Sequence, residues 1–113
     1  YERMEETPII VIKKDGNRQS FDRSKIEKGI IKSCEKRPVQ IDEIDRAVDN
    51  IEKRIRNSMK REISSHEIGE LVMDELKDLD EVSYVRFASV YRQFKDTESF
   101  LNELVKILEK KKE

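Results

Sequence analysis

The residues best placed to do chemistry in this chain are lysines near its start. Lys13 and Lys14 end a run of β-branched residues and are followed at once by Asp15-Gly16, while Lys25 lies at the expected start of a helix. The first helical turn carries the positive end of the helix dipole, so a lysine there is unfavourable unless an anion lies nearby. Three ammonium groups and free helix N–H groups would together suit a phosphate chain.

The same lysines have a simpler explanation. Charged side chains protect an exposed edge strand from pairing with other chains, and Lys13, Lys14 and Arg18 would serve that purpose. Gly16 adds little evidence, because Asp-Gly is the usual pair of a two-residue hairpin turn whatever its function. From the spacing alone we favour the edge strand, with the anion site as the alternative.

Neither catalysis nor metal binding is indicated. His66, the only histidine, has no cysteine, aspartate or second histidine at ligand spacing, so we expect an exposed residue in the first turn of a helix. The single cysteine, Cys34, falls on an apolar helix face where small thiols usually pack. No Ser-His-Asp or Cys-His arrangement can be assembled, and we predict that the chain is not an enzyme.

Aromatic side chains recur at helical spacing toward the C-terminal end: Tyr84, Phe87, Tyr91 and Phe94. We predict that most of them fill the core or the contacts between helices. Stacking of Tyr84 or Tyr91 on a nucleobase is the alternative.

A hairpin must position the first lysines. The β-branched run at residues 9–12, entered through Pro8 and followed by Asp15-Gly16, predicts two short antiparallel strands joined by a tight turn. Glu62-Ile63 is a short extended segment that could add an edge strand to the same sheet.

Helices account for most of the remaining chain. The first begins at Ser24, or at Asp22 as the alternative cap, and ends before Pro38. The second runs from near Asp42 to near Met59. Their predicted core positions are Ile26, Ile30 and Cys34 in the first helix and Ile44, Val48, Ile51 and Ile55 in the second.

Three further helices are predicted. A capping box over residues 64–67 opens the third, Asp80 caps the fourth, and Asp96 or Thr97 caps the fifth. The apolar face predicted for the third helix comprises Ile68, Leu71, Val72, Met73, Leu76 and Leu79. That of the fourth comprises Val82, Val85, Ala88, Tyr91 and Phe94, and that of the fifth comprises Phe100, Leu101, Leu104, Val105 and Leu108. The expected fold class is α+β, with a small antiparallel sheet of two to three strands capping a bundle of four to five helices.

The bulk composition limits the partners. With 24 Lys and Arg against 25 Asp and Glu, the net charge of -1 gives no global reason to bind DNA. One cysteine cannot form an intramolecular disulfide, which favours a reducing, cytoplasmic setting. No stretch approaches the ~20 apolar residues of a membrane span, so no membrane partner is expected.

Two segments resemble a known domain. Residues 11–16 (Val-Ile-Lys-Lys-Asp-Gly) and 21–26 (Phe-Asp-Arg-Ser-Lys-Ile) are similar to the opening of ATP-cone domains, the nucleotide-binding regulatory modules of many ribonucleotide reductases. Residues 34–39, 67–73 and above all 84–94 resemble the NrdR family, the bacterial repressors of ribonucleotide reductase genes. This resemblance runs from Tyr1 almost to the C-terminus.

The resemblance implies a division of the chain. Family members carry an N-terminal zinc ribbon that binds DNA, and that ribbon is absent from this sequence. We therefore expect a fragment in which residues 1–8 are the remnant of a linker, residues 9–95 form the ATP-cone, and residues 96–113 form a C-terminal helix with an oligomer contact. Zinc would belong to the missing ribbon alone, and binding of operator DNA by this chain should be weak or absent.

The resemblance also implies ligands, ATP and dATP, which Mg²⁺ can accompany. Lys13 and Lys14 would face the phosphates, and Lys25 would close the pocket. On the base side the matched positions are Val11, Gln19 and Asp22, and Ser65 at the start of the third helix matches a further one. Tyr91 is included among the predicted site residues because its ring could stack on the base. Two departures stand out: Gln19 replaces the more usual glutamate, and Gly69 replaces a histidine found in several reductase cones.

The implied mechanism is a sensor, in which ATP and dATP shift a homo-oligomer between a DNA-binding and a non-binding arrangement through differential affinity. The helix face around Phe100, Leu104 and Leu108 is a candidate for the contacts that change. Two alternatives stay open: a regulatory cone broken from a reductase, and a helical interaction module whose lysines only solvate an edge strand.

Overall fold

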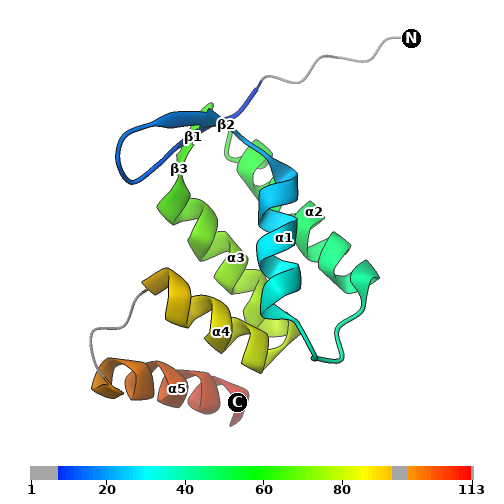
Figure 1. The fold of residues 1–113 in the computed structure, drawn as a ribbon, viewed down its shortest axis with the longest axis vertical. Helices are drawn as coiled ribbons and strands as arrows, with labels where there is room; N and C mark the ends of the chain where they lie inside the picture. The colour runs from blue at the N-terminus through cyan, green and yellow to red at the C-terminus, as the bar shows by residue number, and fades with distance from the viewer. Residues whose placement is uncertain (1–7, 93–96, 113) are drawn as a thin grey trace.

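The computed structural model describes residues 8–92 and 97–112. A three-stranded sheet lies at one end of the helices and α5 at the opposite end (Figure 1). In chain order the elements are β1 (Ile10–Ile12), β2 (Arg18–Ser20), α1 (Arg23–Ser33), α2 (Ile41–Asn57), β3 (Glu62–Ser64), α3 (Ser65–Leu79), α4 (Glu81–Arg92) and α5 (Thr97–Lys112). The predicted α+β class and the small sheet on a helical bundle are confirmed.

The sheet is mixed, whereas an antiparallel sheet was predicted. Its strand order is β2-β1-β3, and β1 pairs antiparallel with β2 but parallel with β3. Parallel strands need a long crossover, and α1 and α2 supply it between β1 and β3. An ion pair between Arg18 and Glu62 joins the two outer strands.

The hairpin loop is longer than the predicted two-residue turn. Lys13 N–H donates to the Asn17 carbonyl at 2.8 Å, and Gly16 N–H donates to the Lys13 carbonyl at 2.8 Å. This is a type I turn closed by a glycine in a left-handed conformation, since Gly16 has a φ of 92°. Asp15 instead accepts the Asn17 N–H on its side chain.

Side chains cap the helices that frame the sheet. Asp22, the predicted alternative, is the cap of α1, and its Oδ1 accepts both the Ser24 N–H and the Ser24 hydroxyl. Ser24 therefore lies inside the helix and is not its cap. The box predicted at the start of α3 is confirmed, with Ser64 and Glu67 capping each other.

The core lies where α1, α2, α3 and α4 meet beneath the sheet. The buried cluster comprises Ile9, Ile30, Cys34, Ile44, Val48, Ile51, Ile55, Ile63, Val72, Met73, Leu76, Tyr84 and Ala88. Most predicted core positions of α1 to α4 belong to it or pack against it. The core prediction for Val82 is wrong: it is 38% exposed, whereas Ser83 and Tyr84 in the same turn are fully buried, so Val82 lies on the outer face of α4.

Several predictions concern residues that are not described. The first seven residues of the linker remnant predicted at 1–8, the core role of Phe94 and the cap at Asp96 lie outside the described residues, as do the side chains of Phe100 and Leu108. Thr97 is the first residue of α5 rather than its cap. In the same helix Leu101 and Val105 are 52% and 49% exposed.

Candidate functional site

A cavity of about 380 Å³ lies between the hairpin and the helices, and we call it the hairpin pocket. It is lined by Val11, Lys13, Gln19, Ser20, Phe21, Asp22, Lys25, Ile26, Gly29, Ser65, Ile68, Gly69, Val72, Phe87 and Tyr91. Seven of the eight predicted site residues are therefore brought together from β1, β2, α1, α3 and α4. Its size falls in the range of small-molecule sites, about 300–1,000 Å³.

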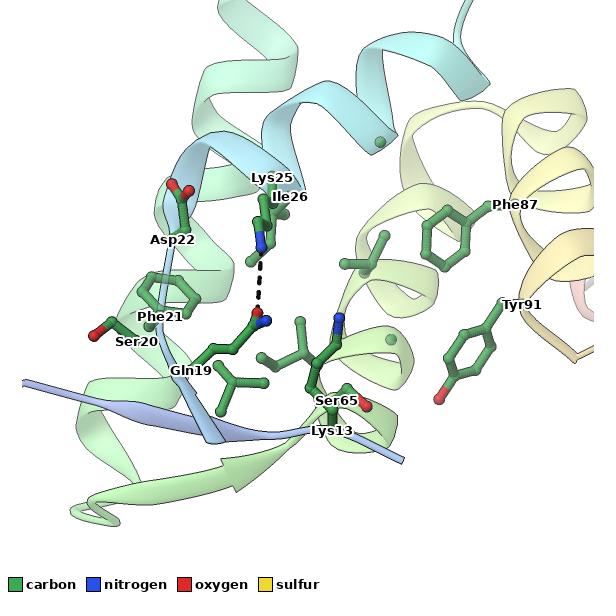
Figure 2. Close-up of a pocket in the computed structure, with 15 residues that line it drawn as sticks. Lys13, Gln19, Ser20, Phe21, Asp22, Lys25, Ile26, Ser65, Phe87 and Tyr91 are labelled. Atoms are coloured by element: carbon green, nitrogen blue, oxygen red, sulfur yellow. Dashed lines mark hydrogen bonds between the residues drawn. The ribbon is translucent and has the colours of Figure 1, made fainter. Parts of the chain in front are cut away.

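Two lysines bring positive charge to the hairpin pocket. Lys13 leaves β1 with its ammonium group extended into the cavity, between Lys25 on one side and Phe87 and Tyr91 on the other (Figure 2). Asp22 is the one carboxylate among the lining residues. Two ammonium groups against one carboxylate leave this wall with an excess of positive charge.

Lys25 is tied to the second strand. Its Nζ donates a hydrogen bond to Gln19 Oε1 at 3.2 Å (Figure 2). The first turn of α1 contains no acidic residue, so the helix dipole and Lys25 act in the same direction. An anion reaching Lys25 would meet positive potential from both sources.

Asp22 is engaged with its own helix. Hydrogen bonds from the side chain and then the backbone of Ser24 lower the pKa of Asp22, and the charges of Lys25 and Lys28 lower it further. The carboxylate is thus ionised near neutral pH. Oδ1 is occupied by the cap, which leaves Oδ2 as the oxygen suited to accept from a ligand N–H.

An aromatic wall faces the lysines across the hairpin pocket. Phe87 and Tyr91 lie one turn apart on α4, with ring centroids 5.8 Å apart and planes inclined by 24°. Flat apolar surfaces of this kind suit a nucleobase or another planar group. Phe87 was predicted only as a core or contact residue, although its spacing of four from Tyr91 already placed both on one helix face.

Lys14 is the one predicted site residue that does not line the hairpin pocket. It lines a neighbouring cavity of about 680 Å³ at the start of α3, together with Ser64, His66 and Glu70. We call this the α3 cavity. The two cavities share Lys13, Ser65 and Tyr91 among their lining residues.

Tyr84 cannot stack on a ligand in this fold. Its side chain is fully buried, and its hydroxyl donates to Glu103 Oε2 at 2.6 Å. Of the two tyrosines considered for stacking, Tyr91 alone reaches the hairpin pocket. The prediction that Tyr84 fills the core is confirmed.

Cys34 and His66 occupy the environments predicted for them. Cys34 is buried, and its burial raises the pKa of the thiol, which disfavours the reactive thiolate. The His66 side chain is 76% exposed in the first turn of α3. Across residues 8–92 and 97–112, no cluster of three His, Cys, Asp or Glu side chains could hold a metal ion. No helix within the same ranges is long and apolar enough to span a bilayer.

Comparison with known proteins identifies the domain. A family model described as the ATP cone domain matches residues 9–97. Proteins named transcriptional repressor NrdR align along nearly the whole chain. The one from Caldicellulosiruptor bescii is 61% identical over 98% of this chain and 72% of its own length. Those from Acetivibrio thermocellus and Alkaliphilus metalliredigens are 59% and 57% identical, over 98% and 100% of this chain and 74% and 73% of their own lengths.

These relatives are named as repressors and not as enzymes, in agreement with the prediction from the sequence. The chain belongs to the NrdR family of transcriptional repressors, and most of it is an ATP cone domain.

Proposed function

We propose that this chain is the nucleotide sensor of a cytoplasmic repressor of ribonucleotide reductase genes, and that ATP and dATP bind in the hairpin pocket. The observation that carries the proposal is the arrangement of Lys13 and Lys25 opposite the Phe87 and Tyr91 rings around one cavity. A nucleotide needs this combination, because its phosphates are anionic and its base is planar.

The phosphate end is assigned to the lysines. Lys13 lines both the hairpin pocket and the α3 cavity, and Lys14 lines the second of them. A phosphate chain running from one cavity to the other could contact both. Ser65, in the first turn of α3, is shared by the two cavities and adds a hydroxyl at the positive end of that helix dipole.

The base end is assigned to the hairpin and α1. Val11 supplies an apolar surface, the Gln19 amide can both donate and accept, and Asp22 can accept from the adenine amino group. Tyr91 completes the wall on the opposite side. Specificity for adenine would then depend mainly on two short polar side chains rather than on the lysines.

Regulation would pass through α4. This helix carries Phe87 and Tyr91 at the pocket, Val90 with 77% of its surface exposed, and Tyr84 at the contact with α5. We propose that ATP and dATP differ in their affinity for two arrangements of a homo-oligomer, and that one arrangement favours operator DNA. Couplings of this kind are typically about 1–3 kcal/mol.

Calorimetric titration of ATP and dATP into the chain tests ligand binding. We expect saturable binding that is weakened strongly in the Lys13→Ala, Lys14→Ala variant. Lys53 and Lys106 are exposed and line neither the hairpin pocket nor the α3 cavity, so Lys53→Ala, Lys106→Ala is a charge-matched control that should bind normally. Absence of binding by the unmodified chain, or equal affinity in the two double variants, would disprove the proposal.

Sedimentation velocity with and without each nucleotide tests the regulatory part. A sensor predicts a different mass distribution with ATP than with dATP. A helical interaction module whose lysines only solvate the sheet edge predicts self-association that ignores both nucleotides, and that result would favour the module.

A further inference from the structure

Tyr91 stands at the meeting point of three cavities. It lines the hairpin pocket, the α3 cavity, and a third cavity of about 630 Å³ between α1 and α4 that also involves Lys36 and Arg86. No other described residue lines all three. The position of this one ring therefore sets where each cavity ends.

Two hydrogen-bonding atoms of His66 hold the Tyr91 hydroxyl. The hydroxyl oxygen lies 2.5 Å from the His66 carbonyl oxygen and 2.9 Å from His66 Nδ1. A phenol has one proton, and a carbonyl can only accept, so the hydroxyl donates to the carbonyl. The hydroxyl oxygen can then accept from Nδ1, which requires a proton on that nitrogen. The His66 and Tyr91 rings also stack, with their centroids 5.9 Å apart and their planes inclined by 29°.

Gly69 makes room for the ring on α3. A Cβ at this position would lie 2.2 Å from Tyr91 Cε1 and 2.4 Å from Cζ, far inside contact distance. Its backbone is helical, so the reason for glycine here is the close approach and not a left-handed conformation. A side chain at position 69 would exclude Tyr91 from the place it occupies.

We infer that His66 and Gly69 are positioning residues for Tyr91, and that they hold its ring as a preset wall against which the nucleotide binds. This inference rests on the proposed function. A wall fixed before binding loses little side-chain freedom when the ligand arrives, whereas a free tyrosine would have to be ordered at a cost in affinity. His66 thus acts on the ligand through Tyr91, while its own ring is largely exposed.

Calorimetry with ATP on His66→Ala, Tyr91→Phe and the double variant tests the coupling. Ordering one side chain corresponds to a loss of about two- to twelvefold in affinity for each single variant. The double variant should bind no more weakly than the weaker single variant, because Tyr91→Phe already removes the hydroxyl that the His66 imidazole contacts. Asp78→Ala, an exposed position on the same helix, is the control and should bind as the unmodified chain does.

His66→Asn separates positioning from a general effect of truncation. The asparagine amide can present an N–H close to the place of Nδ1, so this variant should recover most of the affinity lost in His66→Ala. The Tm values of both variants should match that of the unmodified chain, because the His66 side chain is 76% exposed. Normal nucleotide binding by His66→Ala, or fully additive losses in the double variant, would overturn the inference and leave the proposed function intact.

A readout without any ligand comes from the histidine itself. His66 is the only histidine of the chain, so nitrogen NMR of the imidazole is unambiguous. For the neutral imidazole we expect the Nδ1–H tautomer in the unmodified chain and a change of tautomer in Tyr91→Phe. Identical imidazole nitrogen shifts in the two proteins would contradict the inference whatever the nucleotide titrations give.

Gly69→Ala tests the role of Gly69 in positioning Tyr91. The added methyl should displace Tyr91 and weaken ATP binding at least as much as His66→Ala, although alanine itself favours the helix. In a Tyr91→Ala background the same change should have no further effect on ATP binding. Equal losses from Gly69→Ala in both backgrounds would exclude the close approach as the cause.

Discussion

The Lys25 ammonium group donates to the Gln19 side-chain oxygen at 3.2 Å, and this contact joins α1 to β2 along the wall of the hairpin pocket. It fixes the amide so that its oxygen faces Lys25, and the NH₂ group is the part left to meet a ligand. In this orientation the amide offers a ligand only a donor, and it can accept from a base only if the bond to Lys25 breaks and the amide rotates.

Gln19→Glu should sharpen the choice of base. A carboxylate only accepts, so it favours the amino group of adenine over the carbonyl of guanine, while the amide tolerates both. The affinity ratio of ATP to GTP should rise about two- to tenfold, which corresponds to one hydrogen bond of about 0.5–1.5 kcal/mol. Competition calorimetry measures the ratio. Asn102→Asp makes the same charge change at an exposed site on α5 and should leave the ratio unchanged; an equal rise there would point to net charge.

Asp80 connects the α1–α2 loop to the start of α4. Its carboxylate accepts from Arg37 Nε at 3.0 Å and Nη2 at 3.1 Å, and it also caps α4 through the Ser83 N–H and hydroxyl. Burial alone would raise the pKa of Asp80, but the hydrogen bonds from Arg37 and Ser83 outweigh it and lower that pKa.

A lowered carboxyl pKa has a defined effect on stability. The stabilisation is complete above the unfolded-state pKa of about 3.9 and is lost as the pH falls through the folded-state value. Asp80→Asn should therefore reduce the free energy of unfolding at pH 7 by about 1–3 kcal/mol, and the difference should shrink below about pH 4. Urea unfolding across this pH range measures it. Asp78→Asn, exposed on α3, is the control, and a difference that persists unchanged to about pH 2 would disprove the ion-pair origin.

Periodic apolar patterns predicted the helices because each pattern is local and long. The stripe Ile44, Val48, Ile51 and Ile55 is fully buried, and the capping box at Ser64 begins α3 as expected. The site positions came from the resemblance to ATP-cone domains, since the lysine spacing alone favoured an edge strand. The structure contradicts the edge-strand explanation for Lys13 and Lys14, because β1 is the central strand and pairs with β2 on one side and β3 on the other. Both lysines line cavities instead.

What the sequence could not predict depends on contacts distant in the chain. A three-residue strand such as β3 has too little pattern to reveal its parallel pairing with β1, which is set by the intervening helices. Asp22 and Ser24 are equally good caps by type, and only the folded backbone selects Asp22. The fit of Tyr91 over Gly69 joins two helices, and neither local sequence carries a signal for it.

Met59 follows the C-cap of α2 with a φ of 63°, and its side chain is 87% exposed. A left-handed conformation costs a residue with a Cβ about 1–2 kcal/mol. Glycine avoids this steric cost, but it loses more conformational entropy on folding, which cancels part of the gain. Met59→Gly should therefore stabilise the chain by about 0.5–1 kcal/mol, measured by urea unfolding. Met59→Ala removes the same side chain but keeps a Cβ in the left-handed conformation, so it should not raise the free energy of unfolding. Equal increases in both variants would mean that the methionine side chain is responsible.

Tyr84 anchors α5 to the rest of the domain. The ring is fully buried in α4, its hydroxyl donates to Glu103 of α5 at 2.6 Å, and Lys77 lies over the ring at 5.6 Å from its centroid. Tyr84→Phe removes the hydroxyl and keeps the ring beneath Lys77. A hydrogen bond to a charged group contributes about 1.5–3 kcal/mol, so α5 should open more often while α1 to α3 remain closed.

Hydrogen exchange resolves these helices separately. In Tyr84→Phe the amides of α5 should exchange about tenfold to a hundredfold faster, with little change in α1 to α3. Glu103→Gln keeps an oxygen that accepts the same bond and should retain most of the protection. If α5 also carries the contacts between copies of the chain, as its exposed Leu101 and Val105 suggest, Tyr84→Phe should in addition weaken self-association in sedimentation. Faster exchange spread evenly over all helices would instead show that the hydroxyl supports the whole core and that α5 has no separate stability.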